Sequence, residues 1–290
     1  MMIELENSEI SIKVKHLGAE LSSIQRKDTS LEYLWQADEK IWGRHAPILF
    51  PIVGKLKDQK YISNNKEYTL PQHGFARDME FELKEKDHSY ALFELESNET
   101  SLKNYPFKFK LQVIYKLEGN SVIISNKVEN LGQNEMPFSI GAHPGFNCPL
   151  LPNENYEDYY LEFEKPQKLV NHGIKEGLVS GKTEDLGDQV KKIQLTKHLF
   201  DNDALVFKNL SSTSLTIKST KNPHSVEVDF PNFPYLGIWT KPGTYSFICI
   251  EPWYGVADSI DADGNILKKE GIQLLEPGES FTCDYNIKVK

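Results

Sequence analysis

Apolar and polar residues alternate with a period of two along much of the chain. The run Ile10-Ser11-Ile12-Lys13-Val14-Lys15 alternates strictly, and Phe81-Glu82-Leu83-Lys84 repeats the pattern. This period puts every second side chain on one face, as in a β-strand with one buried side. Residues 107–113 and 121–126 alternate on either side of Glu118-Gly119-Asn120, which predicts a β-hairpin.

Six further segments are predicted as strands because they are short, apolar or alternating, and bounded by Gly, Pro, Asn or Asp: residues 159–164, 204–208, 215–218, 225–230, 245–251 and 285–289. Helical patterning is scarce: Glu99 to Asn104 fits a turn or two, and 190–200 is ambiguous. No linker, repeat or shift in composition divides the chain. We therefore expect an all-β fold, a large antiparallel β-sandwich with few short helices, in one domain over residues 1–290.

Charge and composition narrow the classes of partner. The 290 residues include 33 Lys and Arg against 42 Asp and Glu, a net charge of −9 that is dispersed along the chain. Nucleic acid is not expected as a partner, because phosphate binding needs clustered basic residues. A membrane is not expected either, since no apolar run approaches ~18 residues. The N-terminus lacks the basic start and apolar core of a secretory signal. Three widely spaced cysteines indicate reduced thiols and a cytoplasmic protein: Cys148, Cys249 and Cys283.

One glutamate and two histidines are the strongest candidates for chemistry. Glu251 follows the apolar residues 248–250 and precedes Pro252, which tends to end strand pairing. Partial burial there would raise the pKa of the carboxyl and make it a usable base. His143 lies between Gly141-Ala142 and Pro144-Gly145, a turn that would fix the imidazole and let a ligand approach the backbone. A carboxylate and an imidazole can move two protons without a metal or cofactor, so neither is expected.

His73 lies in a similar turn, Pro71-Gln72-His73-Gly74. Taken singly, each of these residues has an ordinary structural explanation, as a solvated glutamate at a strand end or a surface histidine in a loop. The functional interpretation rests on all three occurring together. The loop 148–156, rich in Pro and Asn, is a candidate rim for the cleft.

Residues with binding chemistry accompany them. Arg44 and Arg77, with Lys55 nearby, offer a corner for sugar oxygens or a phosphate, although an arginine stem can also simply cover the core. Asp203 is a candidate hydroxyl acceptor or, equally, the residue of an Asx-turn. Trp253 supplies an aromatic face on which the CH groups of a sugar can pack.

Other chemistries have weaker support. The phosphate-binding G-x-x-x-x-G-K-[ST], the dinucleotide G-x-G-x-x-G, the G-x-S-x-G elbow and the H-E-x-x-H zinc motif are all absent. A metal-dependent enzyme would have to use His73, His143 and Glu251 from remote positions. A glycosidase would need two carboxylates, for which Asp203 is a weak partner to Glu251.

Three motifs in order resemble the aldose 1-epimerase (galactose mutarotase-like) superfamily, and within it the LacX-like branch. They are Pro71-Gln72-His73-Gly74-Phe75-Ala76-Arg77, Gly141-Ala142-His143-Pro144-Gly145-Phe146 and Cys249-Ile250-Glu251-Pro252-Trp253. The similarity extends from Leu17-Gly18-Ala19-Glu20-Leu21 to Leu275-Glu276-Pro277-Gly278-Glu279. It implies a β-supersandwich with a sugar cleft across one sheet.

The resemblance also implies roles. Glu251 would be the general base for the anomeric hydroxyl and His143 the general acid for the ring oxygen. His73 would bind the sugar near that oxygen, and Arg44 and Asp203 would bind ring hydroxyls. Arg44 and Arg77 match arginines of the branch that includes hexose-6-phosphate mutarotases. The expected activity is therefore a cofactor-independent aldose 1-epimerase of an aldohexose or hexose phosphate. The alternative is a sugar-binding or regulatory module without turnover; the preferred sugar and the oligomeric state stay open.

Overall fold

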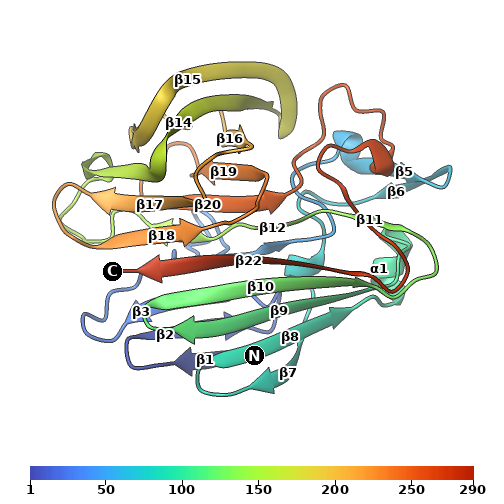
Figure 1. Cartoon of the computed structure of the whole chain (residues 1–290), viewed down its shortest axis with the longest axis horizontal. Coiled ribbons are helices and arrows are strands. Elements are labelled where there is room, and N and C mark those ends of the chain that lie inside the picture. Colours follow the sequence, from blue (N-terminus) through green and yellow to red (C-terminus); the bar gives the residue numbers. More distant parts are fainter.

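The computed structural model describes residues 1–290, and its largest element is a nine-stranded antiparallel sheet (Figure 1). In spatial order its strands are β15 (Leu178–Gln194), β14 (Tyr159–Lys175), β17 (Ser214–Ser219), β18 (Ser225–Asp229), β22 (Ser280–Val289), β10 (Ser121–Asn130), β9 (Phe109–Glu118), β8 (Tyr90–Glu96) and β7 (Glu82–Lys86). β22, near the C-terminus, joins the two halves of this sheet by pairing with both β18 and β10.

A second, six-stranded sheet carries the residues of functional interest. Its order is β16 (Leu205–Lys208), β19 (Tyr235–Trp239), β20 (Phe247–Tyr254), β12 (Ile140–Ala142) and β4 (Ile48–Leu49), and β13 (Gly145–Asn147) also pairs with β20. β12 and β13 therefore share one side of β20, with a turn between them. That turn contains His143.

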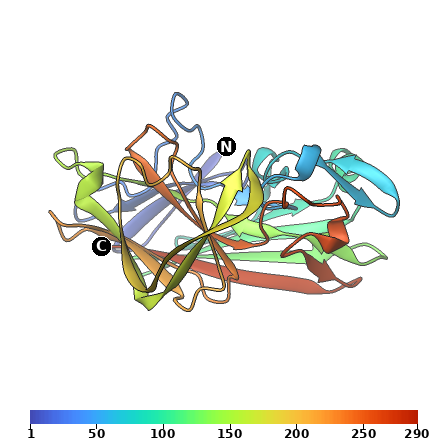
Figure 2. The same ribbon diagram turned by 90° about the horizontal axis from the view of Figure 1, so that it is seen from above.

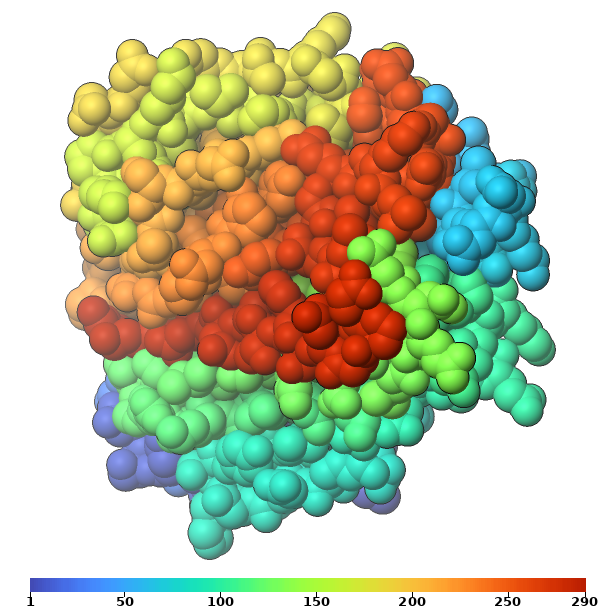
Figure 3. Space-filling model, turned by 45° about the vertical axis from the view of Figure 1, so that its right-hand side comes forward, coloured from blue at the N-terminus to red at the C-terminus, as the bar shows by residue number.

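Three small sheets and five helical turns complete the chain. The sheets are β1 (Met2–Glu6) with β2 (Ile10–Lys15) and β3 (Leu21–Arg26), β5 (Lys60–Ser63) with β6 (Lys66–Thr69), and β11 (Met136–Phe138) with β21 (Gln273–Leu275). The helices are α1 (Glu99–Asn104) and the 3₁₀ turns η1 (Lys57–Gln59), η2 (Ala76–Asp78), η3 (Tyr156–Asp158) and η4 (Ile266–Lys268). Figure 2 shows the dark blue N-terminal strands on one face and red β22 on the other. In Figure 3 the β5–β6 hairpin (blue) lies beside the segment around η4, where Ile62 donates to the Gly264 carbonyl.

The predicted alternation matches the burial of the long strands. In β10 every second residue is buried, from Val122 to Asn130, and β9 follows the same rule from Phe109. Their apolar faces join a core cluster of 64 buried residues that extends from Leu5 to Val289. The other face of this sheet is more exposed, as expected for an antiparallel layer with one covered side.

β20 differs because both of its faces are buried. Ile248 and Ile250 belong to the main core cluster on one face. The alternate residues Phe247, Cys249, Glu251 and Trp253 share the opposite face, where two small apolar clusters replace the main core. The Glu251 carboxylate therefore lies in a layer of apolar side chains. The sequence pattern of the strand does not indicate that this face borders a cleft.

The all-β prediction is confirmed, with twenty-two strands and one α-helix whose bounds match the predicted Glu99 to Asn104. The hairpin around Gly119 is confirmed, and its strands are longer than predicted. The ambiguous segment 190–200 continues β15 to Gln194 and then turns. No helix in the structure has the length and hydrophobicity needed to cross a bilayer.

Candidate active site

A cleft of ≈ 1040 Å³ opens on the face of β20 that carries Glu251. Six of the seven residues predicted to act in catalysis or binding line it: His73, Arg77, His143, Asp203, Glu251 and Trp253. They come from segments as far apart in the sequence as residues 73 and 253. The prediction that residues 148–156 rim the cleft is wrong, since none of them lines it. Tyr156 instead packs against Tyr245, with 5.8 Å between the rings.

Glu251 lies within β20 rather than at its end, which corrects the expectation that Pro252 stops the strand. Pro252 stays in register with Leu236 of β19. On the other side of β20, Ile250 donates its N–H to the Pro144 carbonyl. Because backbone donors alternate along a strand, Pro252 would direct an N–H to that same side, where β12 ends and the His143 turn begins. The missing donor therefore falls at a break in the partner strand and costs little pairing.

The Glu251 carboxyl is 2% exposed, and this burial raises its pKa well above the usual value of 4.5. The nearby indole N–H of Trp253 opposes the shift without completing a hydrogen bond, and the charge of Asp203 adds to it. Glu251 is opposite Gly237 of β19, so no side chain from the facing residue covers it. The carboxyl therefore holds its proton at neutral pH and stays open to the cleft.

His143 is the partner of Glu251, with its Nε2 3.1 Å from Oε2 of the carboxyl. The imidazole stacks on Trp42 at 5.0 Å and 28°, and meets the edge of Trp239 at 5.8 Å. Burial among these rings lowers the pKa of His143 to about 3, and the charges of Arg77 and other basic groups add to that effect. Burial therefore favours the neutral form of both side chains, with the proton on Glu251, although the 3.1 Å contact does not have the geometry of a hydrogen bond.

His73 lies 5.5 Å from His143, ring to ring and edge to face. Its backbone is left-handed, with φ of +66°, and its Nδ1 accepts the N–H of Gly54 at 3.1 Å. Burial, and then the positive charges around it, keep the pKa of His73 well below 6.5. With Nδ1 occupied as an acceptor, the neutral ring carries its proton on Nε2. Gly74 cannot be replaced easily, because a Cβ there would lie 2.2 Å from the Phe50 carbonyl oxygen.

Trp253 forms part of the cleft wall, and two glycines make room for it. A Cβ on Gly237 would lie 2.3 Å from the indole ring, and one on Gly141 would lie 2.7 Å from it. The sequence interpretation of Gly141, as a place where ligand approaches backbone, is therefore wrong: the space is filled by Trp253. The glycines instead allow an aromatic ring to lie flat beside Glu251.

The predicted basic residues differ in whether they line the cleft. Arg77 lines the cleft, donates to the Gln72 carbonyl at 2.6 Å and has a buried Nε without a hydrogen-bond partner. Arg44 is the one predicted site residue that does not line the cleft; its guanidinium donates to Asp78 at 2.8 Å. Asp78 also lies 3.7 Å from Arg77, so one carboxylate holds both arginines at the same edge. Lys55 also lines the cleft and donates to the Glu176 carbonyl.

Asp203 does not form the predicted Asx-turn, because its carboxylate accepts the N–H of the next residue, Ala204, at 2.7 Å and not that of the residue two positions on. Its backbone is left-handed, with φ of +81°. It also lines the cleft, and its charge acts on Glu251. The remaining carboxylate oxygen is available to a hydroxyl group.

The aldose 1-epimerase family model matches residues 1–284. The chain belongs to the aldose 1-epimerase family. It is therefore a carbohydrate epimerase with a mutarotase-type function. The match includes all three motifs around His73, His143 and Glu251.

Relatives of this epimerase match it over its whole length. The plasmid-borne protein LacX of Lactococcus lactis subsp. lactis is 38% identical and matches 100% of this chain and 99% of its own. The galactose mutarotase related enzyme of Lactobacillus acidophilus has a TM-score of 0.96 at 37% identity, covering 100% of this chain and 97% of its own. A galactose mutarotase-like protein of Lactobacillus casei has a TM-score of 0.95 at 33% identity, with full coverage of both. These matches agree with the predicted LacX-like branch.

One set of side chains in the epimerase has the spacing of metal ligands. The donor atoms of His143, Cys249 and Glu251 lie within 4.8 Å of one another. This is not the predicted alternative set, since Cys249 takes the place of His73. Burial raises the pKa of the Cys249 thiol well above its ordinary value, so both it and Glu251 are protonated. A cation needs deprotonated ligands, so the set fits proton transfer better than metal binding.

Sequence reasoning missed two tryptophans of the epimerase cleft, Trp42 and Trp239. Trp239 ends β19, whose residues Tyr235-Leu236-Gly237-Ile238-Trp239 are rich in strand-forming types, and this is the signal that could have identified it. Trp42 lies in a segment without regular structure, so nothing in its local pattern indicates which way the ring points. Only the packed structure brings it to His143.

Proposed function

We propose that this epimerase interconverts the α and β anomers of an aldohexose or hexose phosphate by acid–base ring opening at Glu251 and His143. The observation that carries the proposal is the 3.1 Å contact between the two side chains inside a cleft large enough for a sugar. The raised pKa of Glu251 and the lowered pKa of His143 support a resting state in which Glu251 holds a proton and His143 is neutral. His73, with its proton on Nε2, adds a hydrogen-bond donor to the lining of the same cleft.

The proposed step balances without a cofactor. A proton passes from Glu251 to His143, giving a carboxylate and an imidazolium. The carboxylate takes the proton of the anomeric hydroxyl while the imidazolium gives its proton to the ring oxygen, and the bond between C1 and the ring oxygen breaks. Rotation of the aldehyde and reversal of the transfers yield the other anomer. Ring opening leaves Glu251 protonated and His143 neutral, the state that burial favours.

The test is anomer exchange followed by NMR, since spontaneous mutarotation gives the baseline rate. Glu251→Gln and His143→Asn should each lower kcat by ~10²–10⁴-fold. Glu154→Gln is the matched control, because it removes a partly buried carboxylate that does not line the cleft. Full activity in both site variants would refute the mechanism. Sugar binding by calorimetry without any rate enhancement in the wild type would favour the binding-module alternative.

The identity of the sugar is a finer part of the proposal. Arg77 and Lys55 are the cationic groups of the cleft, and the Nε of Arg77, which makes no hydrogen bond, supports an anionic substituent. Glucose, galactose and their 6-phosphates should be compared in the same assay. If Arg77 binds the phosphate, Arg77→Gln should lower kcat/KM for that substrate by ~10–100-fold more than for the free sugar, the range of a hydrogen bond to a charged group. Equal losses would remove Arg77 from phosphate recognition.

We also propose a cytoplasmic location, supported by three buried cysteines that form no disulfide. Roles for Arg44 and Asp203 as hydroxyl ligands belong to the same proposal. For Arg44 the support is indirect, through the Asp78 carboxylate that it shares with Arg77.

A further inference from the structure

The wall of the cleft that stacks on His143 is an irregular segment rather than a helix or strand. It comprises residues 35–47, and Trp42 projects from it onto the imidazole. The carbonyl of His45, three residues on, accepts the N–H of Gly145 at 2.8 Å, two residues beyond His143. The segment therefore contacts the ring of His143 and, at Gly145, the backbone that follows it, so a shift in the segment at these points moves both contacts.

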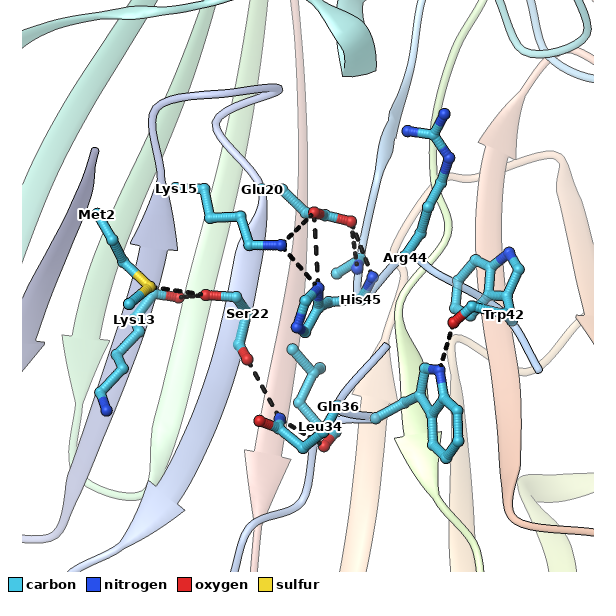
Figure 4. Close-up of polar contacts among 12 residues, drawn as sticks. Met2, Lys13, Lys15, Glu20, Ser22, Leu34, Gln36, Trp42, Arg44 and His45 are labelled. Atoms are coloured by element: carbon cyan, nitrogen blue, oxygen red, sulfur yellow. Dashed lines mark hydrogen bonds and ion pairs between the residues drawn. The ribbon is translucent and has the colours of Figure 1, made fainter. Parts of the chain in front are cut away.

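Glu20 holds this segment through hydrogen bonds to its backbone. Its Oε1 accepts the backbone N–H of His45 at 2.8 Å and that of Ala46 at 3.2 Å. Its Oε2 faces Lys15 at 3.4 Å and the His45 ring at 3.6 Å, as Figure 4 shows. Burial alone would raise the pKa of Glu20, but the hydrogen bonds from His45 and the charge of Lys15 outweigh it and hold the pKa below 4.5. The carboxylate is therefore charged and accepts strong hydrogen bonds.

The backbone that carries Glu20 is itself anchored to the large sheet. Glu20 lies between β2 and β3, and the carbonyl of the preceding Ala19 accepts the buried hydroxyl of Tyr115 in β9. The chain of contacts thus leads from the large sheet through Glu20 to the segment and on to His143. In Figure 4 the labelled Glu20 lies between Lys15 and the segment that carries Arg44 and His45. Side chains supported in this way keep catalytic groups within a fraction of an ångström of their productive positions.

We propose that Glu20 is a positioning residue of the epimerase site, which holds the 35–47 segment so that Trp42 and the Gly145 N–H fix the imidazole of His143. This inference rests on the proposed function for its catalytic consequence, but the structural link does not depend on turnover. Glu20 does not line the cleft and touches no substrate. Its removal leaves two buried backbone N–H groups without an acceptor, so the segment must move to satisfy them.

The test compares three variants of Glu20 with one control. Glu20→Ala removes the acceptor, and Glu20→Asp keeps the charge near Lys15 but withdraws the carboxylate from the two N–H groups. Both should lower kcat by up to ~10²-fold, the loss typical of a misplacement of about 1 Å. Glu20→Gln restores a carbonyl acceptor and should recover most of kcat. Glu154→Ala removes a carboxylate that holds a different loop and should leave kcat unchanged.

A second readout separates positioning from general destabilisation. The stacked indole of Trp42 shields the ring protons of His143, so their NMR resonances, assigned by their loss in His143→Asn, report the stack directly. Glu20→Ala and Glu20→Asp should move these resonances toward unshielded positions, and Glu154→Ala should not. Unchanged resonances and kcat in both Glu20 variants would overturn the proposal. Absence of catalysis in the wild type would refute the proposed function, while the shifts would still test the contact.

Discussion

Replacing Glu251 with Gln should change how the stability of the protein depends on pH. In the folded protein the pKa of Glu251 is raised well above 4.5, and that of His143 is lowered to about 3. Between pH 4.5 and 6.5 the folded pair holds one proton on Glu251, and the unfolded chain also holds one, on His143. In this range the pair therefore does not make the stability of the protein depend on pH. Above pH 6.5 the unfolded chain loses its proton while the folded pair keeps its own, so stability falls.

Glu251→Gln isolates the histidine. Its lowered pKa contributes stability that is complete above pH 6.5 and is lost as the pH falls toward about 3. The stability of the wild type relative to the variant should therefore fall continuously as the pH rises above 4.5. The slope is at most about 1.4 kcal/mol per pH unit, because one proton is involved. From pH 5 to pH 7 the difference in free energy of unfolding should change by up to about 2.7 kcal/mol.

Urea unfolding followed by tryptophan fluorescence at pH 5, 6, 7 and 8 measures this difference. Glu154→Gln is the control, and its stability relative to the wild type should not follow the same curve. A difference between wild type and Glu251→Gln that stays constant across the range would mean that Glu251 is ionised in the folded protein. The neutral resting pair, with its proton on Glu251, would then be refuted. So would the proposal that ring opening returns the pair to that state.

Three further substitutions test the frame of the cleft. Gly237→Ala should destabilise the protein by about 1–3 kcal/mol and lower sugar affinity, because its Cβ would overlap the Trp253 ring; denaturation and calorimetry measure both. Lys269→Met should cost about 3–5 kcal/mol by leaving buried Asp258 without its 2.8 Å partner, and recovery in the double variant with Asp258→Leu would identify the ion pair as the cause. Gly74→Ala should lower both Tm and kcat, since φ of +70° and a close carbonyl leave no room for a methyl group; an unchanged Tm would contradict this.

The parts of the fold that the sequence predicted are those with local patterns. The alternation in residues 109–118 and 121–130 predicted a hairpin because one face of the sheet is covered and the other is not. β20 gave a weaker signal, since both of its faces are buried and its apolar run has no period. Its continuation through Pro252 could not be predicted, because the break in pairing that accommodates it comes from β12 and β13, about 110 residues earlier. The assignment of residues 1–290 to one domain stays a prediction.

Residue types predicted the centre of the site better than its walls. Glu251, His143 and His73 stand in motifs that mark turns or strand ends, and the structure brings all three to one cleft. Trp42 has no such mark, and its place depends on hydrogen bonds between the 35–47 segment and Glu20, which are non-local. Gly141 was interpreted as part of a turn that a ligand approaches, yet it makes space for Trp253, as does Gly237. Contacts between distant segments decide such positions, and a single sequence does not encode them in any local pattern.

The aromatic wall links sugar binding to the protonation of the catalytic pair. Trp42 and Trp239 exclude water from His143, and the same exclusion keeps the proton on Glu251. Burial disfavours an ion pair, so the neutral form of the two side chains is favoured without a sugar. Under the proposed mechanism, hydroxyl groups of a bound sugar would stabilise the ionic form through which the reaction begins. The rings that line the cleft would then also tie the reactive state of the pair to binding.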